Sequence, residues 1–161
     1  IREGIAGGGS LPPPAIQHLL AADRAMHEEE IKSILQKGTI VVSDRYLWSS
    51  VPYGLADRDE FSNNTGSVLL AAQSILSMYH QFILPDLTIY LKISVDIAVK
   101  RIEEMGKEKE MYEHRDKLEK IKEGYDWLLE QFPKEITVVD GKKPVEEVTK
   151  SIFKIIHAMS S

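Results

Sequence analysis

Three short segments rich in β-branched residues, with helical patterns between them, constrain the fold of this chain more than any other feature. The segments are 39–43 (TIVVS), 87–93 (LTIYLKI) and 136–139 (ITVV). A short run that is apolar on both faces is typical of a buried strand in a parallel sheet. Asp44 follows the first segment and Asp140 follows the last. Strands that alternate with helices predict an α/β layered fold with a parallel sheet.

Apolar residues recur at helical spacing in the rest of the chain. We expect helices over 15–37, 67–82, 95–105, 116–131 and about 144–159. The first follows Pro14 and stops at Gly38, and a break near His27 is an open alternative. The second, 67–82, is apolar on more than one face. We therefore expect it to pack against the sheet on one side and against a dimer partner on the other.

Length and composition exclude several classes of protein. A chain of 161 residues predicts one domain. The net charge of −5 argues against a nucleic-acid partner. With no Cys, the chain can have no disulfide framework, zinc-thiolate site or thiol nucleophile. The sequence has neither an apolar run of membrane length nor a signal-peptide pattern, so we expect a cytoplasmic protein with no membrane partner.

The residues after the strands are the first candidates for a site, because ligands of open α/β sheets bind at the carboxyl ends of the strands. Segment 40–44 (IVVSD) has the Walker-B pattern, in which the carboxylate holds Mg²⁺ through water; a simple turn Asp is the alternative. Arg45 would offer a forked cation to phosphate oxygens, or it could form an ordinary surface ion pair. Ser94 and 140–141 are the other strand ends.

Several longer segments resemble those of the thymidylate kinases, which are P-loop nucleoside monophosphate kinases. Segment 44–53 (DRYLWSSVPY) resembles the DRYxxSSxAY signature of this family. Further matching segments are 20–25 (LAADRA), 84–91 (LPDLTIYL), 111–113 with Leu118, Ile121, Gly124 and Tyr125, and 139–148. These segments follow the order and spacing of the family across nearly the whole chain.

The resemblance implies a P-loop NTPase-type fold of three layers, α/β/α, around a parallel sheet. It implies a single nucleoside monophosphate kinase domain over 1–161, with a short lid at about 105–115. The activity implied is transfer of the γ-phosphoryl group of ATP to dTMP, giving dTDP, with Mg²⁺ and in a homodimer.

The resemblance also implies roles for individual residues. Asp44 and Arg45 are the implied catalytic residues, and Asp44 would hold the metal indirectly through water. Residues implied to bind the acceptor nucleotide are Leu20, Arg24, Arg45, Ser49, Ser50, Tyr53 and Glu113. Gly141 and Lys142 would lie along the adenine of ATP. Alternatives stay open: Tyr53 could be a packing aromatic, and Ser49 and Ser50 could cap a helix.

Two positions differ from the family pattern in ways that bear on base selectivity. Leu20 stands where the family has a phenylalanine that stacks on thymine, and Gly54 stands where it has a glutamine. Loss of aromatic stacking removes roughly 0.5–1.5 kcal/mol. A kinase for a related deoxynucleoside monophosphate is therefore one alternative.

The resemblance implies a P-loop, and this is the largest implied feature that these residues do not contain. Segment 4–10 has the GxxxxG spacing followed by Ser, but it lacks the Walker-A Lys, and we interpret it as a loop. We expect either that the polypeptide is longer, with a first strand and P-loop ahead of these residues, or that the chain is a truncated or rebuilt form. We expect these 161 residues alone to lack kinase activity. A nucleotide-binding fragment or relic of the fold, or a structural or regulatory α/β protein, is the remaining alternative.

Overall fold

A computed structural model describes residues 11–58, 65–104 and 115–159 of the chain. The elements are α2 (Pro13–Gln36), α3 (Leu47–Asp57), α4 (Thr65–Ser77), β1 (Ile89–Lys92), α5 (Val95–Glu104), α6 (Arg115–Gln131), β2 (Thr137–Asp140) and α7 (Val145–Met159). Within these residues, no helix is both long enough and apolar enough to cross a membrane.

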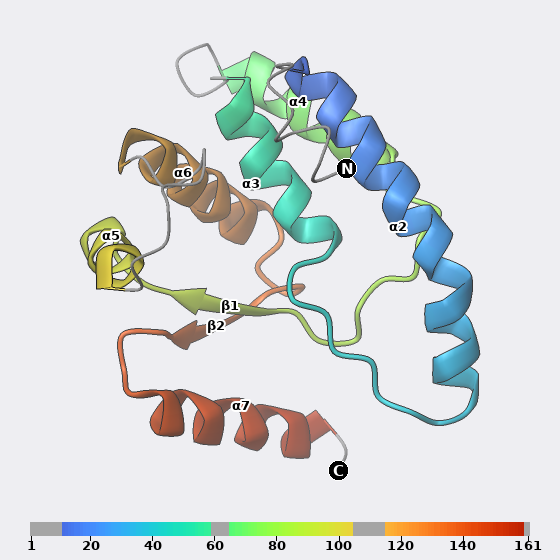
Figure 1. The fold of residues 1–161 in the computed structure, drawn as a ribbon, viewed down its shortest axis with the longest axis vertical. Coiled ribbons are helices and arrows are strands. Elements are labelled where there is room, and N and C mark those ends of the chain that lie inside the picture. Colours follow the sequence, from blue (N-terminus) through green and yellow to red (C-terminus); the bar gives the residue numbers. More distant parts are fainter. Residues whose placement is uncertain (1–10, 59–64, 105–114, 160–161) are drawn as a thin grey trace.

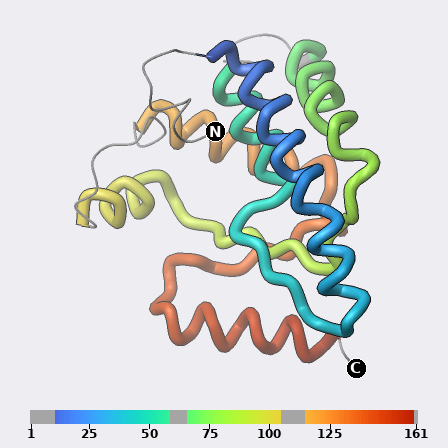
Figure 2. Tube along the Cα trace, turned by 45° about the vertical axis from the view of Figure 1, so that its right-hand side comes forward, coloured from blue at the N-terminus to red at the C-terminus, as the bar shows by residue number. Residues whose placement is uncertain are grey.

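The described strands form a parallel pair with helices on both sides. Ile89 pairs with Thr137, and the register continues to Lys92 opposite Asp140. Figures 1 and 2 place α7 on one side of the two strands and α3 and α6 on the other. The α/β class, the parallel sheet and the three-layer arrangement are therefore confirmed. The parallel connection from β1 to β2 runs through α5 and α6, as a crossover between parallel strands requires.

The prediction of a buried strand over 39–43 is wrong. Among the described residues the sheet has two strands, and 39–43 belongs to neither. Ile40 is 79% exposed and Val42 is 89% exposed. β-Branched residues favour an extended backbone, but a strand also needs a neighbour that completes its hydrogen bonds and covers its side chains. No described strand takes that place beside 39–43.

The predicted helices are confirmed with small changes at their ends. α2 is continuous through His27, so the open alternative of a break there is wrong. It ends at Gln36, two residues before Gly38, whose φ of 74° suits glycine, and the Gly38 N–H donates to the Leu35 carbonyl over 2.9 Å. α4 ends at Ser77, earlier than the predicted Phe82, and it packs against α3 instead of the sheet.

Helix α3 is the element that the sequence analysis missed. Pro52 lies inside it, and a proline in that position normally marks a break. The signal that identifies the helix is the spacing of Leu47, Val51 and Leu55, which are buried along one face. These side chains form the centre of the core. Other core members from α4, the turn after it and α6 include Ala72, Ile75, Tyr79 and Leu128.

Helices α3 and α6 approach closely where Gly124 faces Pro52. A Cβ atom on Gly124 would lie 2.6 Å from the Pro52 Cα and 2.9 Å from its Cβ. We expect Gly124→Ala to lower the free energy of unfolding by about 1–3 kcal/mol, because backbone must move to relieve the contact. Urea denaturation measures the change. The control is Glu123→Ala at the exposed neighbouring position. A Gly124→Ala protein as stable as wild type would contradict the expectation.

Candidate active site

Three side chains from separate parts of the chain form a polar triad, which we define as Arg24, Ser50 and Tyr79. Arg24 on α2 donates from Nη1 to Ser50 Oγ over 2.5 Å and to the Tyr79 hydroxyl over 2.8 Å. Ser50 Oγ on α3 donates to the Tyr79 hydroxyl over 3.0 Å. Ser50 and Tyr79 are buried, and Arg24 is half-buried. The Tyr79 oxygen thus accepts twice, which leaves its own proton available to donate.

The polar triad is a donor-rich site. The Arg24 guanidinium carries five N–H donors and no acceptor, and it also lies 5.2 Å from the centre of the Tyr79 ring. Hydrogen bonds from a charged donor are roughly twice as strong as neutral ones. A ligand that fits the polar triad must therefore present an acceptor such as a carbonyl oxygen.

Arg45 and Tyr53 form a second contact of predicted site residues. The Arg45 guanidinium lies 4.8 Å from the centre of the Tyr53 ring. Burial raises the pKa of the Tyr53 hydroxyl above its ordinary value, and the positive charge of Arg45 opposes this shift. The Tyr53 phenol therefore stays neutral at physiological pH and keeps its proton.

The backbone at Arg45 has an unusual conformation. Its φ is +66°, a region that non-glycine residues rarely adopt, and its carbonyl accepts a hydrogen bond of 2.8 Å from Ser43 Oγ. Strained backbone of this kind clusters at functional sites. The preceding Asp44 is exposed, so the carboxylate and the guanidinium stand side by side in the chain at an accessible turn.

Ser49 and Ser50 point to different neighbours. Ser50 belongs to the polar triad, whereas the Ser49 hydroxyl lies 3.0 Å from the hydroxyl of Tyr125 on α6. The Tyr125 ring stacks on Tyr90 with centres 4.6 Å apart. Burial, with the negative charge of Asp126, raises the pKa of Tyr90 to about 12. Adjacent positions on a helix face directions about 100° apart, which separates the two serines.

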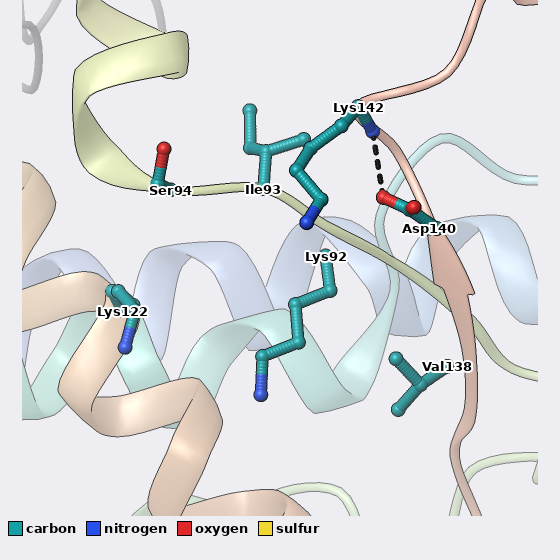
Figure 3. A pocket seen from close by; sticks show the side chains of 7 residues that line it. All are labelled: Lys92, Ile93, Ser94, Lys122, Val138, Asp140 and Lys142. Carbon is teal, nitrogen blue, oxygen red and sulfur yellow. Dashed lines mark hydrogen bonds between the residues drawn. The ribbon is translucent and has the colours of Figure 1, made fainter.

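A separate cavity of about 360 Å³ lies at the carboxyl ends of β1 and β2. Figure 3 shows its lining side chains, which are Lys92, Ile93, Ser94, Lys122, Val138, Asp140 and Lys142. The Lys142 N–H donates to Asp140 Oδ1 over 3.0 Å, and the Gly141 N–H donates to the Lys92 carbonyl over 3.0 Å. A Cβ on Gly141 would lie 2.9 Å from Ile93 Cγ2, so this tight turn requires glycine.

Two lysines of this cavity share one carboxylate. Lys92 Nζ lies 3.4 Å from Asp126 Oδ1, and Lys122 Nζ donates to Asp126 Oδ2 over 2.5 Å. Burial of Asp126 works against its charge, but Lys122 and Lys92 together lower the pKa of this carboxyl. The arrangement keeps two ammonium groups at the edge of the cavity, where an anionic ligand would meet them.

The structure therefore divides the predicted site residues between two regions. Arg24, Ser50, Arg45 and Tyr53 lie on or next to α2 and α3, with Leu20 half-buried one turn before Arg24. Gly141 and Lys142 lie at the strand ends. Glu113 and nearly all of the predicted lid lie outside the described residues.

Sequence reasoning missed several residues of these regions. Tyr79 enters only through tertiary contact, and no local pattern marks it. Tyr125 belongs to the matching segments, but its contact with Ser49 is a property of the fold. Lys92 carried a signal, because it lies in the predicted strand 87–93, directly after the matching segment 84–91. Lys122 lacked any signal beyond its place on an amphipathic helix.

The sequence of the chain is similar to those of a family of known proteins. Residues 1–152 match the sequence profile of the family described as thymidylate kinase. A "Probable thymidylate kinase" of Thermococcus gammatolerans is 30% identical over 157 residues, covering 97% of this chain and 70% of the relative. A "Probable thymidylate kinase" of Methanocaldococcus jannaschii is 34% identical over 155 residues, covering 95% and 72%. A "Thymidylate kinase" of Thermosipho melanesiensis is 32% identical over 140 residues, covering 87% and 66%. The chain belongs to the thymidylate kinase family.

Proposed function

We propose that this protein is a nucleoside monophosphate kinase that transfers the γ-phosphoryl group of ATP to dTMP and forms dTDP. The observation that carries the proposal is the polar triad, in which Arg24 and Ser50, predicted from separate sequence segments, meet at one site. Membership of the thymidylate kinase family and the names of the relatives support the same reaction.

The acceptor nucleotide binds between α2 and α3. The donors of the polar triad face a carbonyl oxygen of the base, and Leu20 packs on the face of the base. Tyr53 lies beside the sugar, and Arg45, held over the Tyr53 ring, takes the acceptor phosphate. A planar guanidinium matches phosphate oxygens with two parallel hydrogen bonds and stabilises charge on the transferring group. Ser49 and Glu113 complete the acceptor site.

The ATP side uses the strand ends. Gly141 and Lys142 contact the adenine, and the cationic edge formed by Lys92 and Lys122 attracts the donor nucleotide. Asp44 is the residue that suits Mg²⁺, because this ion typically takes one or two carboxylates and keeps several waters beside substrate phosphates. No cluster of three potential metal ligands exists in the part of the chain that the structure describes. When bound, Mg²⁺ neutralises phosphate charge.

The chain works in this proposal as one cytoplasmic kinase domain, with the segment at about 105–115 as a lid. Its own residues position the two nucleotides and stabilise charge, since phosphoryl transfer needs little covalent chemistry from the protein. Arg115, the first residue of α6, pairs with Asp96 over 2.7 Å and so connects α6 to α5.

The activity is tested with the polypeptide as its source organism makes it. A coupled assay with ATP and Mg²⁺ should show turnover with dTMP and much less with dCMP. Calorimetric titration of the 161-residue chain with dTMP tests the acceptor site without requiring transfer. Failure of dTMP both to bind and to accept phosphate would overturn the proposal.

We further propose that the protein is a homodimer through the outer face of α4. Leu69 and Leu70 are exposed there, Leu70 by 68%, while Val68, Ala71 and Ile75 pack inward. Sedimentation equilibrium at micromolar concentration should give about twice the 18.2 kDa chain mass. Leu70→Lys should give the monomer, because an ammonium group would be buried in the interface. Leu84→Lys, at an exposed leucine outside α4, is the control. A monomeric wild type would contradict the expectation.

A further inference from the structure

Glu28 is a buried acidic side chain that no step of the proposed reaction uses. It lies on α2, and only 7% of its surface is exposed. Burying a charge is costly unless the charge is paired and hydrogen-bonded. Here Oε1 of the carboxylate accepts the backbone N–H of Ile83 over 3.1 Å and lies 3.5 Å from Lys32 Nζ. Glu28 therefore connects α2 to the chain between α4 and β1.

The contact of Glu28 continues the contact of Arg24 along the same two segments. Arg24 donates to the hydroxyl of Tyr79. Glu28, four residues after Arg24, accepts from Ile83, four residues after Tyr79. Side chains four residues apart lie on the same face of a helix. One face of α2 thus holds segment 79–83 at two points, and Figures 1 and 2 show the chain after α4 passing alongside α2.

Segment 79–83 lies beyond the end of a helix and depends on contacts of this kind for its position. Helix α4 ends at Ser77, and turns follow, with the Phe82 N–H donating to the Tyr79 carbonyl over 3.0 Å. The Tyr79 hydroxyl must reach Arg24 and Ser50 to complete the polar triad. Residues outside regular structure are held mainly by tertiary contacts, and the hydrogen bond at Ile83 is one of these.

Glu28 also lies near the start of α3. Burial raises the pKa of the Tyr46 hydroxyl, and the negative charge of Glu28 raises it further. A charge has this effect only at close range, so the carboxylate lies near Tyr46, the residue that directly follows Arg45. The segments that carry Tyr79 and Arg45 therefore approach one buried carboxylate on α2.

We infer that Glu28 is a positioning residue of the acceptor site: its carboxylate holds segment 79–83 so that the Tyr79 hydroxyl meets Arg24. The inference rests on the proposed function, since it takes the polar triad as part of the site for dTMP. Glu28 acts through Tyr79 and does not itself contact the nucleotide. The hydrogen bond to Ile83 carries the effect, and the ion pair with the half-exposed Lys32 adds little.

Calorimetry with dTMP on the full chain tests the inference through three substitutions at one position. Glu28→Leu removes the acceptor of the Ile83 N–H and should weaken dTMP binding roughly tenfold, because a hydrogen bond to a charged group is lost. Glu28→Gln keeps an oxygen that accepts the same N–H, so its affinity should stay within about twofold of wild type. Glu28→Asp keeps the charge but is one carbon shorter, and it should bind dTMP as weakly as Glu28→Leu.

Glu29→Leu is the matched control. Glu29 is exposed and also pairs with Lys32, over 2.8 Å, whereas the Ile83 N–H donates to Glu28. The Glu29→Leu protein should therefore bind dTMP like wild type. Hydrogen exchange of the Ile83 amide provides a readout that needs no nucleotide. The exchange should be faster in Glu28→Leu and Glu28→Asp than in wild type, Glu28→Gln and Glu29→Leu.

A double-mutant cycle shows whether Glu28 acts through the polar triad. Arg24→Met removes the donor that meets Tyr79, so adding Glu28→Leu to it should weaken dTMP binding by about twofold or less. Steady-state kinetics on the polypeptide as its source organism makes it should place the loss in Glu28→Leu mainly in KM, with kcat nearly unchanged. This division is expected for a residue that supports nucleotide binding and not the transfer step.

Three results would each overturn the inference alone. They are a folded Glu28→Leu protein with wild-type affinity for dTMP, a Glu28→Gln protein that binds as weakly as Glu28→Asp, and effects of Arg24→Met and Glu28→Leu that simply multiply. If Glu28→Leu does not fold, Glu28→Asp takes its place in every comparison. A wild-type chain that does not bind dTMP would overturn the proposed function together with the inference.

Discussion

Arg45→Ala should lower kcat/KM for dTMP phosphorylation by about 10³-fold or more. The guanidinium lies over the Tyr53 ring and is exposed at the surface, where it can meet an incoming phosphate. Its charge would act mainly on the phosphoryl group in transfer, so most of the loss should appear in kcat. Steady-state kinetics with ATP and Mg²⁺, on the polypeptide as its source organism makes it, measures the effect.

Two variants distinguish the effect of the Arg45 charge from the effect of its backbone conformation. Arg45→Gly should lose the same activity but be no less stable, because the φ of +66° suits glycine. Arg101→Ala, at an exposed arginine of α5, should retain wild-type kinetics. If Arg45→Ala and Arg101→Ala have similar rates, Arg45 does not take part in the transfer.

Arg24→Met should weaken dTMP binding between about 10- and 100-fold while changing kcat much less. The substitution removes the charged donor that holds Ser50 and Tyr79, and a hydrogen bond to a charged group contributes about 1.5–3 kcal/mol. The apolar stem of methionine preserves packing on α2. Calorimetry of dTMP binding, together with the separation of kcat from KM, measures the change.

The free energy of unfolding of the Arg24→Met protein is a second measurement of the same substitution. Loss of two hydrogen bonds should lower the free energy of unfolding by about 1–3 kcal/mol, although Ser50 and Tyr79 keep their own bond of 3.0 Å. Ser50→Ala, which leaves the Arg24–Tyr79 bond, should show a smaller version of both effects. An Arg24→Met protein with wild-type affinity for dTMP would remove the polar triad from the acceptor site.

Much of the fold could be predicted from local sequence patterns. The predictions that failed did so for a physical reason. Apolar spacing identified most helices because each buries one face in the core. The same reasoning failed for 39–43, whose exposed Ile40 and Val42 show that strand propensity needs a pairing neighbour. It left α3 unpredicted, although Leu47, Val51 and Leu55 are spaced for a helix and Pro52 lies inside it. A proline in a helix is tolerated where surrounding packing compensates for the lost hydrogen bond.

The residues of the candidate site also fall into two groups. Sequence segments predict some of them, and only contacts in the folded chain identify the others. Arg24 and Ser50 were predicted from sequence segments, and their contact is a property of the fold. Tyr79 could not be predicted, because it contacts residues far along the chain.

The pairing of β1 with β2 has a consequence for how the chain folds. The paired residues Ile89 and Thr137 have two whole helices, α5 and α6, between them in sequence. Bringing the strands together costs the entropy of closing that long loop before any ladder bond forms. Helix α3, by contrast, can dock on α4 across a short connection. Local helix pairs should therefore form early, and the sheet should form late and limit the folding rate.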